Sequence, residues 1–168
     1  VEGDHREAFR RFVKASASWR EQQALESPTY YALMETAKTV LVAALDGAVE
    51  PLTMLRGALL GSADESQGSA RRESLYRAVS AFRDDADSLT KMLSVVEPPP
   101  SASAMHDQYV AAAGLTAQAL VNLLVALDEN SKSALETALW TRDYALTSLE
   151  EAVRLHRQLV PPAPSTSR

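Results

Sequence analysis

The stretch SARRESLYRAVSAFRDDADSLTKMLSVV, residues 69–96, decides the fold class of this 168-residue chain. Its apolar residues recur at alternating four- and three-residue steps, and this seven-residue repeat turns one narrow seam of a helix toward its neighbours. The spacing suits the shallow crossing, about 20°, at which bundle helices pack. We therefore predict a long bundle helix with an inner seam formed by Leu75, Val79, Phe82, Ala86, Leu89, Leu93 and Val96.

Two helices are predicted upstream of this stretch. The first spans residues 4–25 and ends before Ser27-Pro28, because proline disfavours a helical conformation in the preceding residue but is accepted at the first position of the next helix. The second helix starts there and is interrupted between Gly47 and Pro51. Its inner side is predicted to consist of Tyr30, Met34, Ala37, Leu41, Ala44 and Leu45.

The segment from Ala48 to Leu60 is predicted to be either a kinked continuation of the second helix or a short separate helix. The segment GSADESQG, residues 61–68, then concentrates small and polar residues and predicts a surface loop. On the far side of the long helix, Pro98-Pro99-Pro100 predicts a stiff connector that ends it.

Two further helices form a predicted antiparallel hairpin. One runs over about 103–127, with a seam of Tyr109, Ala113, Thr116, Leu120, Leu123 and Leu127. Asp128-Glu129-Asn130 is too short to span any distance, and Ser133 with Glu136 has the spacing of a capping box that starts the last helix. The last seam is predicted to contain Leu135, Leu139, Leu146, Leu149, Val153 and Val160.

Together these elements predict an all-α fold: an antiparallel up-and-down four-helix bundle with an additional N-terminal helix and a Pro/Gly-interrupted second helix. The chain is long enough to bury one continuous core, so we expect a single helical-bundle domain over residues 1–160. The tail PPAPSTSR, residues 161–168, has the composition of a disordered terminus.

Composition narrows the possible functions. The net charge of -5 argues against a nucleic-acid surface, which needs clustered Lys and Arg, and no unbroken run of 18 apolar residues predicts a transmembrane segment. With no cysteine, the chain has no thiol nucleophile or thiolate metal site. The glycine and serine motifs of phosphate loops, dinucleotide folds and hydrolase elbows are absent too, so we expect a non-enzymatic protein without a cofactor.

Polar residues in two predicted seams are the candidate site. Arg142 and His156 interrupt the apolar pattern of the last helix, and His106 precedes Tyr109 by one turn in the helix before it. Counted outward from the turn near Asn130, the two histidines are at similar distances, which places them within a turn of each other at one end of the bundle. The two histidines and Arg142 have structural explanations as well: histidine at an open bundle end, and an arginine that reaches solvent or pairs with an acidic residue of a neighbouring helix.

Three functional hypotheses remain open from the sequence. The first is a non-enzymatic binding or interaction module that takes a small ligand or a protein partner, or dimerises along one face. The start at Val1, the lack of cysteine, the acidic charge and the Pro/Ser-rich tail favour an extracytoplasmic module of the lipoprotein, secreted or sensor type. The Arg- and Ala-rich composition favours a bacterial source. The second is a cytoplasmic regulator that docks through an N-terminal patch of Phe9, Phe12 and Trp19. The third is a metal- or cofactor-binding bundle that uses His106 and His156.

Overall fold

A computed structural model describes residues 7–11, 13–14, 27–59 and 68–160 of the chain, and every regular element in these residues is helical. The elements are α2 (Ser27–Gly47), α3 (Val49–Leu59), α4 (Gly68–Val95), a 3₁₀ turn η2 (Pro100–Ala102), α5 (Ser103–Glu129) and α6 (Lys132–Leu159). The predicted all-α bundle is confirmed. The predicted loop over 61–68 and the tail over 161–168 lie almost wholly outside the described residues.

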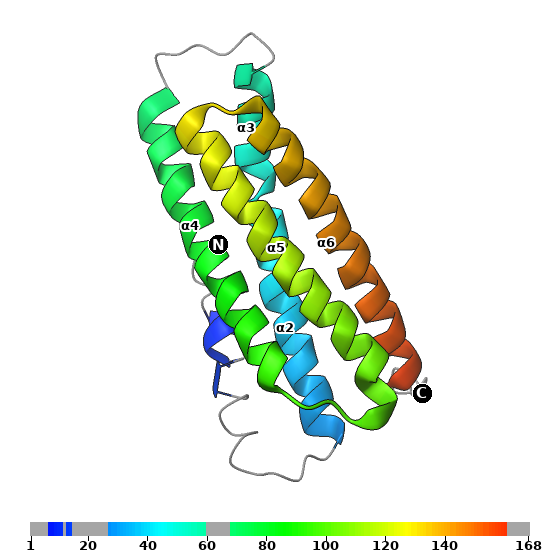
Figure 1. Ribbon diagram of the computed structural model, residues 1–168. Coiled ribbons are helices and arrows are strands. Elements are labelled where there is room, and N and C mark those ends of the chain that lie inside the picture. The colour runs from blue at the N-terminus through cyan, green and yellow to red at the C-terminus, as the bar shows by residue number, and fades with distance from the viewer. Residues whose placement is uncertain (1–6, 12, 15–26, 60–67, 161–168) are drawn as a thin grey trace, which may run out of the picture.

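The helices pack around α5, which lies in front of α2 and between α4 and α6 in Figure 1. The interior consists of two clusters of buried apolar side chains that follow one another along the bundle axis, and each draws on α2, α4, α5 and α6. α5 faces neighbours on several sides and is therefore rich in apolar residues. By length and composition alone it could cross a membrane, but half of its most apolar window is buried within the bundle. An apolar helix in the core of a helical bundle can pass the same test.

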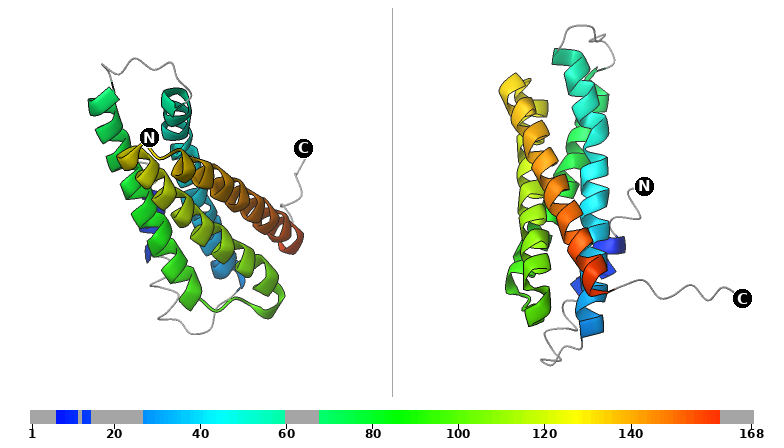
Figure 2. Two further views of the ribbon diagram at one scale, coloured as in Figure 1. Left: turned by 45° about the horizontal axis from the view of Figure 1, so that its top comes forward. Right: turned by 90° about the vertical axis from the view of Figure 1, so that its right-hand side faces the viewer.

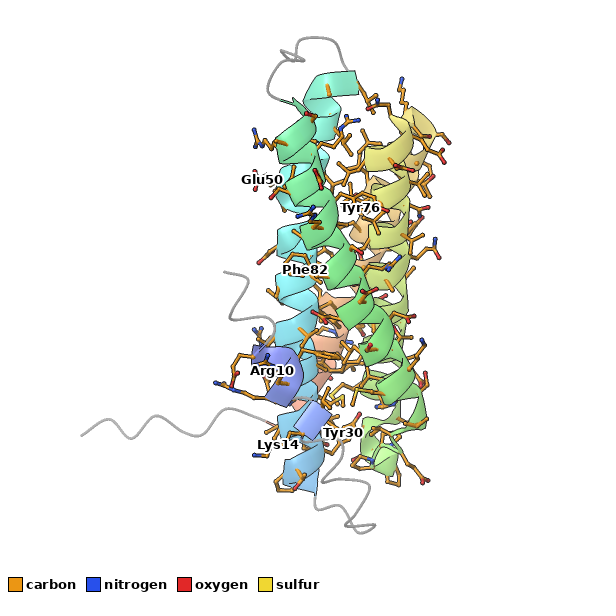
Figure 3. The ribbon with its side chains drawn as sticks, turned by 90° about the vertical axis from the view of Figure 1, so that its left-hand side faces the viewer. Arg10, Lys14, Tyr30, Glu50, Tyr76 and Phe82 are labelled. Carbon is orange, nitrogen blue, oxygen red and sulfur yellow. The ribbon has the colours of Figure 1, made fainter. Side chains whose placement is uncertain are left out.

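The predicted interruption of the second helix is confirmed between Gly47 and Val49. Pro51 has no backbone N–H, so the regular hydrogen-bond ladder cannot continue through this point, and α3 begins a new one with the Leu52 amide donating to the Ala48 carbonyl at 3.1 Å. The ring of Phe82 from α4 packs into the break (Figure 3). A Cβ atom on Gly47 would lie 2.4 Å from this ring, so the glycine makes room for the phenylalanine.

The turn between α5 and α6 is as tight as predicted, but the predicted cap is wrong. Asn130 adopts a left-handed conformation with φ of 52° and ends α5. The N-cap of α6 is Ser131, whose hydroxyl accepts a hydrogen bond from the Ala134 amide at 3.1 Å. Ser133 therefore lies inside the first turn, and no capping box forms with Glu136. Sequence spacing cannot distinguish two serines that are two residues apart.

The predicted seams of α2 and α5 are buried, and so is that of α4 except for Leu75, which is half-buried. By contrast, α6 is rotated from its predicted orientation. Its buried positions outside the polar ones are Leu135, Ala138, Ala145, Leu149 and Ala152. The larger neighbours Leu139, Leu146 and Val153 are only half-buried, and Val160 is exposed. α5 also buries small residues every seven positions, Ala112, Ala119 and Ala126, so small side chains on both helices allow a close approach.

The N-terminal helix contributes to the core through its described residues. Ala8 is buried and Phe9 is half-buried against the first core cluster. Figure 3 shows this segment, marked by Arg10 and Lys14, against α2 on the side away from α6. Phe9 therefore faces the bundle. Phe12 and Trp19, the other members of the predicted docking patch, lie outside the described residues.

Gly47→Ala is expected to lower the free energy of unfolding by about 1–3 kcal/mol, because the added methyl group overpacks against Phe82. Gly57→Ala is the matched control: no atom lies within 4 Å of its added Cβ, so the gain in helix propensity should raise stability by about 0.5–1 kcal/mol. Urea unfolding followed by circular dichroism measures both. Equal effects of the two substitutions would contradict the close contact between Gly47 and Phe82.

Candidate functional site: the groove between α2 and α6

His106 is held tightly inside the bundle by two hydrogen bonds. Its Nε2 lies 2.9 Å from the Leu93 carbonyl and its Nδ1 lies 2.7 Å from the Tyr30 hydroxyl. Because a carbonyl only accepts, Nε2 carries the proton, and Nδ1 therefore accepts from the tyrosine. Leu93 belongs to the last turn of α4, and the one backbone hydrogen bond that its carbonyl accepts among the described residues, from the Val96 amide, is long at 3.4 Å. The role of His106 is to close the end of α4.

His156 is equally buried but loosely held. Its Nδ1 lies 3.5 Å from the Tyr109 hydroxyl and 3.7 Å from Oε1 of Glu35, both at or beyond the limit of a good hydrogen bond. Among the described residues, no hydrogen bond holds its Nε2. The imidazole also lines an open cavity between α2 and α6. Of the two histidines, His156 is therefore the one available to a ligand.

Tyrosine rings join the two imidazoles into one aromatic cluster at this end of the bundle. Tyr30 packs against His106 with ring centroids 5.8 Å apart, and Tyr31 packs against His156 at 5.4 Å. The two tyrosines meet edge to face at 5.5 Å. The histidines thus share one cluster, but tyrosines stand between them.

This arrangement does not favour a metal site at the two histidines. Both nitrogens of His106 are used by protein partners. Across the part of the chain that the structure describes, no group of three or more His, Cys, Asp or Glu side chains is placed to hold a metal ion.

Arg142 also closes a helix end and does not face a ligand cavity. Its Nε donates to the Leu45 carbonyl at 3.1 Å, at the point where α2 gives way to α3. The guanidinium is half-buried. Arg142 and His106 therefore have similar roles: each is a polar side chain in a helix seam that donates to a backbone carbonyl near the end of a neighbouring helix.

The C-terminal part of α6 lies beside α2 (Figure 2), and an open groove lies between these two helices. It contains two adjoining cavities of about 530 and 610 Å³, which share Lys38, Val153 and Arg157 in their walls. Ligand pockets in proteins commonly measure about 300–1,000 Å³. The other main wall residues are Pro28, Tyr31, Ala32, Glu35, Val42, Leu146, Leu149, Glu150, Arg154, His156, Gln158 and Val160.

The rotation of α6 explains why this groove is apolar. Leu146 and Val153 have the periodicity of core residues, but alanines take the positions that face α5. The two larger side chains therefore point toward α2, where nothing in the described chain covers them fully. On α2, Tyr31 is half-buried and Val42 is 40% exposed. Apolar surface in a concave groove is a common mark of a binding site.

Charged side chains border the apolar floor. Glu35 lies between His156 and Lys38. The Lys38 Nζ is 3.5 Å from Oε2 of Glu35. Arg154 is paired with Glu151 on its own helix. Arg157, by contrast, forms no ion pair with any residue that the structure describes.

No protein-family model, curated protein or solved structure matches this chain. Any functional assignment therefore depends on the geometry of the chain itself.

Sequence reasoning missed most of the groove. Of the four candidate residues, only His156 lines it; Tyr109 touches His156 from within the core, while His106 and Arg142 bind backbone carbonyls. Tyr31, Lys38 and Arg157 were not predicted. The sequence feature that indicates a groove is the double apolar stripe of α6. This stripe is wider than the surface that one neighbouring helix can cover.

Tyr30→Phe is expected to lower the free energy of unfolding by about 1–3 kcal/mol, because His106 Nδ1 is then left buried without its donor. Tyr144→Phe is the control, since that side chain is 62% exposed and its hydroxyl stays hydrated. Chemical unfolding at pH 7.5 measures both. A loss no larger than that of the control would mean that the Tyr30–His106 bond does not stabilise the fold.

Stability should also fall as the pH drops below about 6.5. Burial lowers the pKa of both His106 and His156 below the ordinary value of 6.5, so in this range the unfolded chain binds more protons than the folded one. Full stability is present above pH 6.5 and is lost as the pH decreases toward the folded pKa values. Unfolding curves from pH 5.5 to 7.5 measure the slope.

Replacing either histidine separately by glutamine should flatten this pH dependence, whatever the substitution does to stability at pH 7.5. An unchanged slope in both His106→Gln and His156→Gln would show that other groups cause the acid sensitivity.

Proposed function

We propose that this chain is a non-enzymatic binding domain that takes a small apolar ligand in the groove between α2 and α6. One observation carries the proposal: Leu146 and Val153 have the spacing of core residues, yet they line an open groove. A ligand that covers them would complete the burial that the helix pattern encodes, and removal of apolar surface from water contributes roughly 25 cal/mol per Å².

The chemistry of the groove supports binding over catalysis. Tyr109, the hydroxyl nearest to His156, has a pKa raised by burial and so stays protonated at neutral pH. The pKa of His156 is lowered, also mainly by burial, so the imidazole is largely neutral there. His156 lines the groove and can donate a hydrogen bond to a ligand or accept one from it, whereas Tyr109 is buried in the core. The 3.5 Å between the two groups provides no activated nucleophile.

The competing hypotheses receive less support from the geometry. Docking through the N-terminal helix requires an outward apolar patch, and Phe9 faces the core. A metal-binding bundle requires free histidine nitrogens, and those of His106 are occupied.

A neutral aromatic probe tests the proposal. In a titration with 2-naphthol followed by ¹H–¹⁵N NMR, the largest shifts are expected in the parts of α2 and α6 that line the groove. Val42→Glu should weaken binding several-fold by placing a charge in the groove. Val121→Glu is the matched control, because Val121 is a valine of similar exposure, 38% against 40%, on α5.

Shifts concentrated on α4 or α5, or equal losses of binding in the two variants, would refute the groove as the binding site. Because both valines are exposed, both variants should keep the helical circular dichroism of the parent protein.

A further inference from the structure

We propose that the ligand of this groove is an amphipathic anion, a single carboxylate on an aliphatic chain, with its carboxylate held at Lys38 and Arg157. This inference rests on the proposed function and specifies the chemical class of the ligand. It concerns the point where the two cavities meet, because Lys38, Val153 and Arg157 line both of them.

The two cations at this junction differ in how well they are already paired. Lys38 lies 3.5 Å from Glu35, at the limit for a direct contact. Arg157 pairs with none of the carboxylates in the described chain. It lies beside the apolar wall of the groove, next to Val153. A guanidinium holds a carboxylate with two parallel hydrogen bonds, so a carboxylate ligand supplies the missing partner of Arg157.

The walls on either side of the junction are suited to a hydrocarbon chain. From Val153, the second cavity extends along α6 to Leu146, a distance of about 10 Å at 1.5 Å per residue. Val42 and Leu149 complete its apolar wall. The carboxylates Glu35 and Glu150 also line the groove, one in each cavity. They disfavour a second negative charge at a distance from the junction, so a single anionic group fits best.

Matched probes of opposite charge test this inference. Decanoate and decyltrimethylammonium, each used below its micellar concentration, carry the same chain. Decanoate is expected to bind about tenfold more tightly, the ratio that corresponds to about 1.4 kcal/mol. Isothermal titration calorimetry measures both affinities, and NMR shifts locate both probes.

Arg157→Gln should remove most of this preference while leaving the cation's affinity unchanged or higher. Arg56→Gln is the control, because Arg56 is an exposed arginine in the last turn of α3, as Arg157 is in the last turn of α6. Both variants lose the same favourable interaction with a helix end. The preference should survive in Arg56→Gln.

The possible failures separate the two proposals. Equal binding of both probes in the groove overturns the anion inference and leaves the groove as an apolar binding site. Failure of 2-naphthol and both decyl probes to shift groove residues overturns the proposed function as well. A dimer in sedimentation that Val153→Glu dissociates would assign the groove to a second copy of the chain and also overturn the anion inference.

Discussion

The close contact between α5 and α6 through small side chains sets the geometry of the whole bundle. Ala138, Ala145 and Ala152 recur every seven residues on the buried face of α6. Alanine loses no side-chain entropy on burial and lets two backbones approach closely. Because these alanines face α5, the larger residues beside them, Leu146 and Val153, point toward α2. These two side chains form the floor of the groove.

The polar residues within the bundle are explained by the same need to complete each helix. His106 donates to the Leu93 carbonyl at the end of α4, which otherwise accepts only a long bond of 3.4 Å from the Val96 amide among the described residues. Arg142 donates to the Leu45 carbonyl where α2 breaks. Such bonds matter because a buried carbonyl without a partner costs about 1–3 kcal/mol. His156 has no comparable backbone partner and lies beside the groove, which is why it, and not His106, belongs to the proposed site.

Local patterns were enough to predict the fold, because helix seams and breaks depend on short-range spacing. The seven-residue repeat of α4, the break at Gly47 and the hairpin turn at Asn130 all follow from residues close together in the chain. The orientation of α6 does not, because its sequence carries two adjacent stripes, Ala138–Ala145–Ala152 and Leu139–Leu146–Val153. Which stripe faces α5 depends on the sizes of the residues across the interface.

The candidate site could be predicted only in part for the same reason. Counting from the turn brings His106 and His156 to one end of the bundle, but it cannot show that Tyr30 and Leu93 occupy both nitrogens of His106. Lys38 and Arg157 are more than 100 residues apart in the chain, and their meeting at one groove is a property of the packing.

The orientation of α6 can be measured directly by cysteine labelling, since the chain has no cysteine of its own. Single cysteines would be placed at Leu146 and Val153, in the groove, and at Ala145 and Ala152, in the contact with α5. Reaction with a maleimide in native buffer should be fast at the first two positions and strongly protected at the other two. Equal protection at all four positions would mean that the groove is closed in solution and would contradict the account.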